Sequence, residues 1–354
     1  MVVLVPSSYR CSQPSLVRDV LHQMGTLWGI YSPLTHNPSP NPVALKKSDL
    51  NIFDQRRYVV AKKSDGIRYN LLLGTHANKR PYAVLINRAL EIYQIQVFAP
   101  RCYFEGSLFD GELVWHREHH CLIYLVFDVV SSCKDRIGKR NLLERYDAIS
   151  RIFPQECDWD RQSLTDHPIK KAQQLAESGK IVCVPDVENL LFIYSKPSVR
   201  TNALDAIVRS LPDCNHDNDG LIFTPIDEPI RKNRHDSMFK WKFTPSVDLR
   251  YVALGSGLYQ LWCMDGDREV LITDAIQDWN FQIDTIDLDS YAIGGKHIIE
   301  MNVVLNEQTK TITCKRHRIR TDKPSPNDIR TILAIIREIK ESITLDELQK
   351  CLST

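Results

Sequence analysis

The sequence predicts an α+β protein with two domains. At 354 residues, of which 43% are hydrophobic and 25% charged, the chain is long enough for two sizeable cores and has an ordinary globular composition. Short apolar and β-branched runs separated by turn residues fill 58–130, which indicates an antiparallel sheet. Helical spacing of apolar residues follows, and short alternating segments resume near Arg250. Strands and helices kept in separate runs are typical of the α+β class.

The expected elements follow in this order. Residues 1–45 contain a helix candidate, and the proline-rich HNPSPNPVAL after it predicts an extended connector. Beyond the sheet, helices are predicted at 141–153, where Leu142 and Ile149 share a face, and at 201–211. The segments of 250–320 predict a small barrel of about seventy residues. Two terminal helices are predicted, one from Ile329 and one opened by a capping box at Thr344 and Glu347.

Charge and cysteine content narrow the possible functions. With 45 basic and 44 acidic residues, affinity for nucleic acid must come from local clusters, such as those at 231–242 and 315–323. The ten cysteines show no Cys-x-x-Cys and no histidine at zinc-site spacing, so structural zinc is not expected. The start MVVLVP lacks the basic part of a secretory signal, and no run is long enough for a bilayer. We therefore expect an intracellular protein with reduced thiols.

The stretch Lys62-Lys63-Ser64-Asp65-Gly66 lies between two runs that read as buried strands. Taken alone, it is compatible with a hairpin whose charged tip faces water. Further motifs follow it along the chain: LFDGELV with Glu112, YLVFDVV with Phe127 and Asp128, DGLIFTP with Asp219, MFKWKF with Lys240 and Lys242, and RIRTDKPSPN with Arg318, Arg320, Asp322 and Lys323.

This ordered set resembles the covalent nucleotidyltransferase superfamily and, within it, the messenger-RNA capping guanylyltransferases. The resemblance covers nearly the whole chain and is closest to the compact capping enzymes of large DNA viruses such as chlorella virus, as carried by NPVALKKSDL, YVVAKKSDGIR, SLFDGEL and SITLDEL. It implies a nucleotidyltransferase domain at 1–248, with ATP-grasp-like antiparallel sheets and helices and with the N-terminal helix and connector at 1–50. It implies an OB-fold β-barrel at 249–322, and helices at 323–354 that pack back on the first domain.

A lysine amine is protonated at its ordinary pKa of about 10.4, so attack on a phosphate needs neighbouring cations that favour the neutral amine. The candidates for these cations are Lys62, Arg68, Lys240 and Lys242. By the resemblance, Lys63 is the catalytic residue that attacks the α-phosphorus of GTP and carries covalent GMP. Lys62 is the less suitable neighbour, because Asp65 stands at the motif's spacing from Lys63 only. Gly66 is expected to let the backbone approach the nucleotide.

The resemblance also implies which side chains contact the base and the sugar. Phe127 is expected to stack on the guanine, although by pattern alone a strand phenylalanine is more often a core residue. Arg88 is expected to contact the ribose. Asn87 stands where the family more often has aspartate, which leaves its role open. Glu112 and Asp219 are expected to hold the ribose or a divalent metal, Mg²⁺ or Mn²⁺, and Asp248 resembles a further acidic position that would bind the metal.

The remaining basic motifs are expected to bind phosphates. Lys240 and Lys242 share a strand face by the period of two, which suits an α-phosphate. Arg318, Arg320 and Lys323 would grip the β,γ-pyrophosphate, with Asp322 orienting a metal or water, so that domain closure precedes chemistry. The expected GTP-binding residues are thus Asp65, Gly66, Arg68, Arg88, Glu112, Phe127, Asp219, Lys240, Lys242, Arg318, Arg320, Asp322 and Lys323.

The expected function is an mRNA guanylyltransferase that transfers GMP from GTP to the 5′-diphosphate end of RNA. One alternative is an ATP-dependent polynucleotide ligase of the same superfamily, which RIRTDKPSPN disfavours because ligases generally replace this form. Another is a non-catalytic RNA-binding or scaffold homologue, although Lys63, Glu112 and Lys323 are all present. The length leaves no room for further catalytic domains, so a separate RNA triphosphatase and a cap methyltransferase are expected as partners. The compartment is expected to be the nucleus or a cytoplasmic viral factory.

Overall fold

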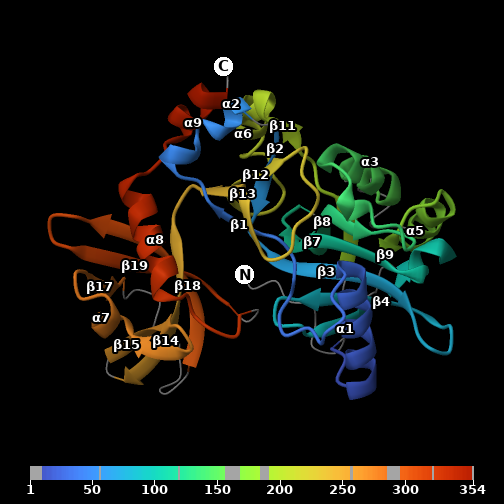
Figure 1. Cartoon of the computed structure of the whole chain (residues 1–354), viewed down its shortest axis with the longest axis horizontal. Coiled ribbons are helices and arrows are strands. Elements are labelled where there is room, and N and C mark those ends of the chain that lie inside the picture. Colours follow the sequence, from blue (N-terminus) through green and yellow to red (C-terminus); the bar gives the residue numbers. More distant parts are fainter. Residues whose placement is uncertain are drawn as a thin grey trace. The chain divides into compact units, whose positions relative to one another are not determined.

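The structure is a computed structural model, in which the chain forms two compact units (Figure 1). It describes residues 10–55, 57–118, 120–155, 168–183, 191–255, 258–284, 296–320 and 323–352. The larger unit contains the described residues of 3–45, 51–241 and 349–354, and the smaller unit contains those of 46–50 and 242–348. Each unit combines antiparallel sheets with helices, which confirms the predicted α+β class.

A six-stranded sheet forms the body of the larger unit, in the order β10-β8-β7-β3-β4-β5. Its strands are β3 (Ile67–Thr75), β4 (Pro81–Asn87), β5 (Ile92–Ile95), β7 (Ser107–His116), β8 (Cys121–Ser131) and β10 (Leu191–Ser195). All neighbours pair antiparallel except β10, which runs parallel to β8. The antiparallel sheet that the hairpin pattern of 58–130 predicts is therefore present, with one later strand added at its edge.

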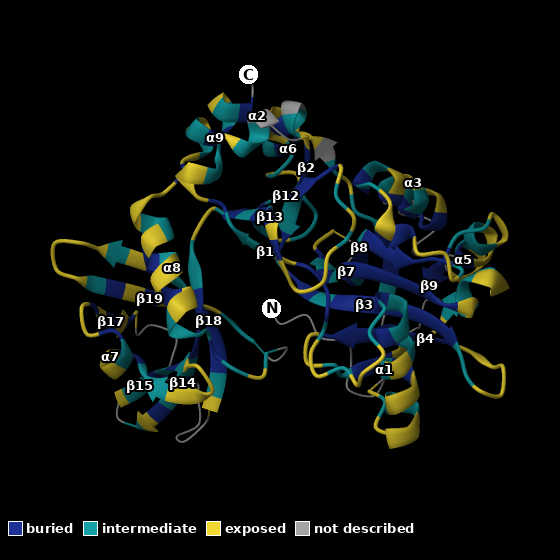
Figure 2. Ribbon diagram, viewed as in Figure 1, coloured by how far each residue is buried: buried dark blue, intermediate teal, exposed yellow. Residues whose placement is uncertain are grey.

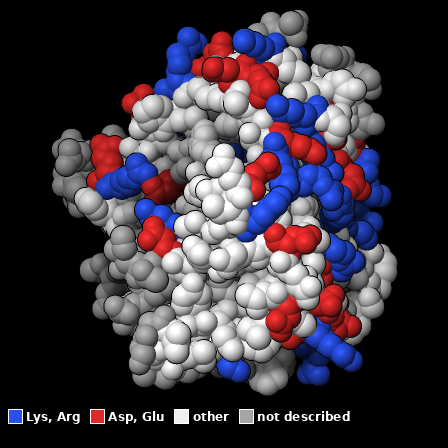
Figure 3. All heavy atoms as spheres, turned by 90° about the vertical axis from the view of Figure 1, so that its left-hand side faces the viewer, with Lys and Arg blue, Asp and Glu red and all other residues white. Residues whose placement is uncertain are grey.

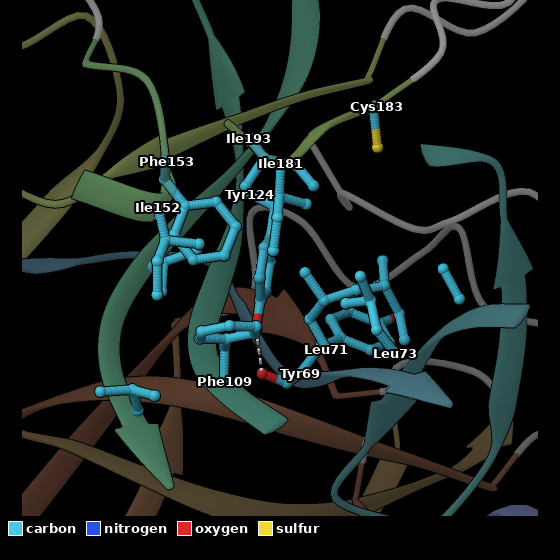
Figure 4. Packing of buried hydrophobic residues seen from close by; sticks show 14 of the residues in the cluster. Tyr69, Leu71, Leu73, Phe109, Tyr124, Ile152, Phe153, Ile181, Cys183 and Ile193 are labelled. Atoms are coloured by element: carbon cyan, nitrogen blue, oxygen red, sulfur yellow. Dashed lines mark hydrogen bonds between the residues drawn. The ribbon is translucent and has the colours of Figure 1, made fainter. Parts of the chain in front are cut away.

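Both faces of this sheet are buried. Successive side chains of β3 point to opposite faces, so this one strand contributes to a core on each side. Tyr69, Leu71 and Leu73 pack on the face covered by helix α3 (Leu142–Ile152), as Figure 4 shows. The Tyr124 hydroxyl donates to the Tyr69 carbonyl over 2.8 Å within that core. Leu72 packs on the other face, where helix α1 (Pro14–Trp28) covers the sheet. The two cores explain why the strands appear as dark, buried arrows in Figure 2.

A second, five-stranded sheet has the order β1-β13-β12-β2-β11. Its strands are β1 (Asn41–Ala44), β2 (Tyr58–Ser64), β11 (Val199–Arg200), β12 (Asn218–Pro225) and β13 (Arg234–Lys242). Because β2 lies in this sheet and β3 lies in the other, the hairpin reading of Lys62–Gly66 is wrong. Asp65 and Gly66 instead carry the chain from one sheet to the other.

Gly66 is required at this crossing by packing alone. A Cβ atom there would lie 2.3 Å from the Leu113 carbonyl oxygen and 2.9 Å from Cγ of Glu112, both on β7. Real Cβ contacts are never this short, so the two strands approach more closely than any other residue allows. The expectation that Gly66 lets a nucleotide approach stays a prediction beside this structural reason.

Shorter elements complete the larger unit. These are α2 (Ile52–Gln55), β6 (Val97–Phe98), α5 (Pro168–Glu177), β9 (Val182–Cys183) and α6 (Leu204–Arg209), with 3₁₀ turns at Arg101–Glu105, Ile137–Lys139 and Thr201–Ala203, whereas the turn at Lys47–Asp49 belongs to the smaller unit. The predicted helices at 141–153 and 201–211 correspond to α3 and to the turn and helix of Thr201–Arg209. Sequence analysis did not predict α5, whose Ala172 is buried against the edge of the sheet.

The smaller unit is a six-stranded sheet in the order β16-β15-β14-β18-β19-β17. Its elements are β14 (Ser246–Gly255), β15 (Leu258–Asp265), β16 (Arg268–Leu271), α7 (Ile272–Ala275), β17 (Asn280–Ile283), β18 (Lys296–Asn306), β19 (Thr311–Ile319), α8 (Ile329–Lys340) and the start of α9 (Leu345–Leu352), whose residues from Gln349 onward belong to the larger unit. Pairing is antiparallel except between β17 and β19. The described helices include none that is long and apolar enough to cross a membrane.

The C-terminal helices were expected to pack back on the first domain, but helix α8 packs in the smaller unit. Its buried Ile332 and Ile336 join the core of the smaller unit, because the apolar stripe of α8 covers the residues of β14 and β15 that face inward. The predicted capping box of α9 is present, since Thr344 Oγ1 accepts from the Glu347 N–H at 3.2 Å and the Glu347 carboxylate accepts from the Thr344 N–H at 2.8 Å. Beyond it, Gln349 donates to Asp205 over 2.9 Å, and both residues belong to the larger unit.

Candidate active site

Lys63 lies at the end of β2 and is held by Asp219. Its Nζ atom is 2.7 Å from Oδ1 and 2.9 Å from Oδ2 of Asp219, and both side chains are about one-fifth exposed. The neighbours of Asp219 on β12 pair with β2, Asn218 with Ser64 and Gly220 with Lys63, so Asp219 is the extra residue of a β-bulge. A bulge re-aims a side chain, and here it directs the carboxylate toward the lysine.

Lys62 points away from Lys63 because adjacent side chains of a strand alternate between faces. Its ammonium donates to the Ser210 carbonyl over 2.6 Å. Lys62 was one of the cations expected to favour a neutral Lys63 amine, and the structure does not support that role. The choice of Lys63 over Lys62 as the candidate nucleophile rests on the motif spacing and agrees with this geometry.

Lys63 borders a cavity of about 130 Å³ in the larger unit. Four more of the predicted site residues line it, namely Arg68, Arg88, Glu112 and Phe127. Apolar and polar neighbours complete the lining, which includes Pro40, Pro42, Ile222, Thr224 and Met238. The strands β2, β3, β7, β8 and β12 thus deliver residues far apart in sequence to one enclosed space.

Phe127 lies close to two cations at this cavity. The guanidinium carbon of Arg68 lies 5.5 Å from the centre of its ring, and Nζ of Lys196 lies 5.6 Å from it. Cations at this distance are attracted by the electron-rich face of an aromatic ring. The alternative of a plain core aromatic is therefore disfavoured, because a core phenylalanine has apolar neighbours on its faces.

Arg68 is compensated by a buried carboxylate that sequence analysis did not single out. It donates to both oxygens of Asp110 over 2.9 and 2.5 Å, and to the Pro40 carbonyl over 2.5 Å. Burial alone would lower the pKa of the Arg68 guanidinium, but the ion pair with Asp110 reverses this and raises it. Arg68 is therefore a fixed cation that holds the connector and Phe127 in place.

Lys196 is a site residue that sequence reasoning missed. It follows β10, and only the parallel pairing of β10 with β8 brings it to Phe127. Burial lowers the pKa of the Lys196 ammonium to about 8, with Glu112 opposing the fall and repulsion from Lys63 adding to it. No motif precedes Lys196, so a sequence search had only an isolated lysine at a strand end to find.

Arg88 lines the cavity from the turn between β4 and β5, and the structure gives Asn87 a role in that turn. The Asn87 amide donates to the Glu91 carboxylate over 2.8 Å, while its oxygen accepts from the Glu91 N–H at 2.9 Å. Asn87 is 2% exposed and so closes the turn from inside. The structure therefore gives Asn87, whose role the sequence left open, a structural role in the turn that carries Arg88.

Asp128, the residue after Phe127, is anchored by a buried arginine. Arg145 of α3 donates to the two oxygens of Asp128 over 2.7 and 3.2 Å, and to the carbonyls of Arg140 and Glu228. Both partners of this ion pair are nearly inaccessible to solvent. Because removing one partner of a buried pair leaves an unpaired charge, this contact rigidly fixes the strand that carries Phe127.

Two further polar groups lie behind the candidate nucleophile. The buried Ser64 hydroxyl is 3.0 Å from Nε2 of His216, and the N–H of Asp65 donates to the Asp217 carbonyl over 2.8 Å. Asp65 therefore fixes the end of β2 through its backbone. His216 was not predicted, because its contact with Ser64 joins residues that are 152 positions apart.

The two lysines of the KWK motif fall in different units. Lys240 belongs to β13 of the larger unit, next to Ala44 of β1, and it is not among the described residues that line the cavity. Lys242 belongs to the smaller unit, where it donates to Ser246 over 2.6 Å and to Glu300 over 3.1 Å. Their assignment to one α-phosphate stays a prediction.

The remaining predicted phosphate-binding residues form a cluster in the smaller unit. Arg318 donates to Glu300 over 2.9 Å, and Arg320 donates to Glu300 over 3.2 Å and to Asp248 over 3.3 Å. Lys323 also pairs with Asp248. Asp322 lies outside the described residues. The assignment of Asp248 to a metal stays a prediction, since its described partners are two cations.

The carboxylates of Glu112 and Asp219 are suitable protein ligands for a divalent ion whose other ligands are substrate phosphates and water. Asp219 contacts Lys63, and Glu112 lines the cavity that Lys63 borders. In the part of the chain that the structure describes, no three metal-ligating side chains are grouped together. Mg²⁺ is commonly held by one or two carboxylates with phosphates and water as its other ligands, so two carboxylates are enough.

Fold and site together place the Lys63 amine at a cavity that Phe127 and the cations Arg68 and Lys196 also line. A family model described as mRNA capping enzyme, catalytic domain, matches residues 12–244, and the chain belongs to that family. It is 27% identical over 218 residues to the mRNA-capping enzyme subunit alpha of Schizosaccharomyces pombe, covering 58% of this chain and 50% of that protein. It is 24% identical over 335 residues to the mRNA-capping enzyme of Danio rerio, covering 89% and 50% respectively.

The chain thus spans about half the length of these curated relatives. Among solved structures, a mycobacterial DNA ligase D complexed with ATP and MES covers 81% of this chain and 94% of its own at 11% identity and a TM-score of 0.39. The DNA ligase of bacteriophage T7 in complex with ATP has a TM-score of 0.33 at 13% identity, with 80% of each chain covered.

Proposed function

We propose that this protein is a GTP:RNA guanylyltransferase, in which Lys63 takes GMP from GTP and passes it to the 5′-diphosphate end of RNA. The observation that carries the proposal is the Lys63 amine, which borders a cavity that Phe127, Arg68 and Lys196 also line, with both cations close to the Phe127 ring. An aromatic base fits against the ring, and its phosphates fit beside the cations. Membership of the capping family supports the same activity.

The first step needs a neutral Lys63 amine. Asp219 is within hydrogen-bond reach at 2.7 Å and is the acceptor for the amine's proton. As the Nζ–P bond to the α-phosphorus forms, the bond from phosphorus to the bridging oxygen breaks and pyrophosphate leaves. A divalent ion held by Asp219 and Glu112 would supply positive charge to the phosphates. In the second step a terminal oxygen of the RNA diphosphate attacks the same phosphorus and Lys63 is released.

Lys196 gives the cavity a preference for guanine over adenine. Guanine presents two neighbouring acceptors, O6 and N7, whereas adenine presents a donor beside its N7. The Lys196 ammonium has only donors and lies 5.6 Å from the ring on which the base would stack. A buried donor matched to an acceptor discriminates strongly, because the wrong base leaves it unpaired.

The wider assignments belong to the same proposal. The smaller unit acts as an OB-fold domain that supplies Arg318, Arg320, Asp322 and Lys323 to the β,γ-phosphates. Basic side chains gather in a band on the face drawn in Figure 3, with acidic ones among them, which supports local rather than global attraction of RNA. A separate RNA triphosphatase and a cap methyltransferase would act before and after this enzyme, and the site of action would be intracellular.

Two alternatives make different predictions. An ATP-dependent ligase would accept adenine, which the donor-only Lys196 disfavours. A non-catalytic scaffold would need no amine beside a carboxylate in the cavity, whereas Lys63 and Asp219 are held 2.7 Å apart.

The experiment that tests the proposal is adduct formation with a labelled nucleotide. The protein is incubated with α-labelled GTP or ATP and Mg²⁺ or Mn²⁺, and then run on a denaturing gel. Label from GTP is expected to stay on the protein, and label from ATP is not. Retention of the ATP label alone would favour the ligase, and retention of neither would favour the scaffold.

A further inference from the structure

Glu300 is a buried carboxylate that neither the motifs nor the proposed mechanism uses. Its side chain is 5% exposed and lies on β18 of the smaller unit. One oxygen accepts from Lys242 over 3.1 Å and from the Ser246 hydroxyl over 2.7 Å, and the other accepts from Arg318 over 2.9 Å and Arg320 over 3.2 Å. Three cations from two segments, Lys242 at the end of β13 and Arg318 and Arg320 at the end of β19, therefore converge on one side chain.

A second carboxylate stands directly opposite Glu300. Asp248 of β14 is its partner in the antiparallel register, and Arg320 donates to both. Like charges at directly opposite positions are destabilising, and buried charges are costly unless paired. The pair persists because cations surround it: burial alone would raise the pKa of Glu300, but Lys242, Arg318 and Arg320 hold it far below its usual range. Glu300 is therefore negatively charged throughout the physiological pH range.

Two partners of Glu300, Arg318 and Arg320, are residues that the proposed function gives to the β,γ-phosphates of GTP, and Lys242 is expected at the α-phosphate. Arginine binds carboxylate and phosphate oxygens in the same forked geometry, and lysine binds both as a point charge. A carboxylate in contact with Lys242, Arg318 and Arg320 thus occupies positions that phosphate oxygens would need. It competes with them for the same donors.

We propose that Glu300 is an internal competitor for the triphosphate, which holds Lys242, Arg318 and Arg320 until phosphates replace it and takes back Arg318 and Arg320 when pyrophosphate leaves. This inference rests on the proposed function for the identity of the ligand. Competition weakens the grip on pyrophosphate and so favours its departure after the first step. The protein thereby binds pyrophosphate less tightly and releases it faster.

The test compares pyrophosphate binding to the unsubstituted protein and to Glu300→Gln by isothermal titration calorimetry. The amide keeps the shape of the side chain and removes its charge, so pyrophosphate is expected to bind about tenfold more tightly, since charge-assisted hydrogen bonds to a competitor are lost. Glu269→Gln is the matched control, because Glu269 pairs with Arg250 in the same unit over 2.6 Å and should leave the affinity unchanged. Unchanged or weaker binding by Glu300→Gln would overturn the proposal.

A second readout separates competition from a merely structural role. In the guanylylation assay, Glu300→Gln should lower the KM for GTP and strengthen inhibition by added pyrophosphate, whereas simple damage to the fold would raise KM or lower kcat alone. If thermal melting shows that Glu300→Gln is unfolded, Glu300→Asp replaces it. That variant keeps the charge but withdraws it by one methylene, and pyrophosphate affinity equal to the wild type would overturn the proposal.

The two proposals fail in distinguishable ways. Pyrophosphate binding needs no transfer of GMP, so the calorimetric comparison remains valid for a protein that never forms an adduct. Absence of the adduct with tighter binding by Glu300→Gln would refute the guanylyltransferase and keep the competitor. Formation of the adduct without any change in pyrophosphate affinity would do the reverse.

Discussion

At the scale of single residues, the site depends on how each charged side chain is compensated. Lys63 and Arg68 both lie at the cavity, but Asp219 compensates the first and Asp110 the second. Lys196 has an aromatic ring in place of a carboxylate as its described partner. It is therefore the cation of this cavity whose charge depends most on pH.

The Lys196 pKa of about 8 gives a testable pH dependence. Below about pH 8 the ammonium is charged and binds the guanine acceptors strongly, and above this value it becomes a neutral and weaker donor. The KM for GTP in adduct formation is therefore expected to rise as the pH passes 8. Lys196→Gln should raise KM about tenfold at pH 7 and abolish the rise. The exposed Lys170→Gln serves as control, and an unchanged pH profile of Lys196→Gln would contradict this role.

Asp219 provides a second prediction at this scale. Asp219→Asn keeps the contact with Lys63 but cannot take up its proton, so the rate of adduct formation at neutral pH should fall by about a hundredfold or more. The loss should become smaller at alkaline pH, where hydroxide removes the proton instead. Single-turnover measurements from pH 7 to 10 check this. A loss that is equal at every pH would show that Asp219 only positions Lys63.

At the scale of elements, the sequence predicts the strands well and their partners poorly. The alternation in β3 and the face of α3 specify local structure, because each depends on residues that are close along the chain. The separation of β2 and β3 into different sheets depends instead on pairing with β12 and β7, which lie far along the chain. For the same reason the candidate nucleophile was predicted from a local motif, whereas Lys196, Asp110 and His216 were found only in the structure.

The crossing between β2 and β3 tests this view of the elements. Gly66→Ala places a Cβ 2.3 Å from the Leu113 carbonyl, so the strands must separate, at a cost of about 1–3 kcal/mol of unfolding free energy. Glu112 moves with β7, and adduct formation should be largely lost. Thermal unfolding and the labelling gel measure the two effects.

Gly179→Ala is the control for this substitution. Gly179 lies in the same unit with a φ of +94°, and no atom lies within 4 Å of the position that a Cβ would take, so an alanine there is strained but meets no neighbour. It should lose stability and keep adduct formation. Equal activity of the two variants would show that the close approach at Gly66 does not serve the site.

At the scale of the whole molecule, the two units divide the chemistry. The larger unit carries the candidate nucleophile and the cavity proposed for the base, and the smaller unit carries the proposed contacts to the β,γ-phosphates. Those phosphates leave after the first step, so residues that bind them should matter only until then. Apart from Lys242, whose expected α-phosphate is present in both steps, the smaller unit acts in this account in the first half-reaction.

This division predicts that Lys323→Ala slows adduct formation from GTP but not the later transfer of GMP to RNA. Removing an interaction present in one step should slow that step alone. If adduct is installed by long incubation with high GTP, its transfer to diphosphate-ended RNA should proceed near the normal rate. Quench-flow measurement of both half-reactions checks this, with the exposed Lys315→Ala as control. Equal losses in both steps would mean that the smaller unit acts throughout the cycle.

The central claim is that Lys63 carries the GMP, and mapping the adduct tests it most directly. The protein is incubated with GTP and a divalent ion and digested, and the modified peptide is sequenced by mass spectrometry. The account predicts GMP on Lys63, complete loss of the adduct in Lys63→Arg because a guanidinium stays protonated, and retention of most of it in Lys62→Arg. GMP on Lys62, or an adduct that survives Lys63→Arg, would contradict the account.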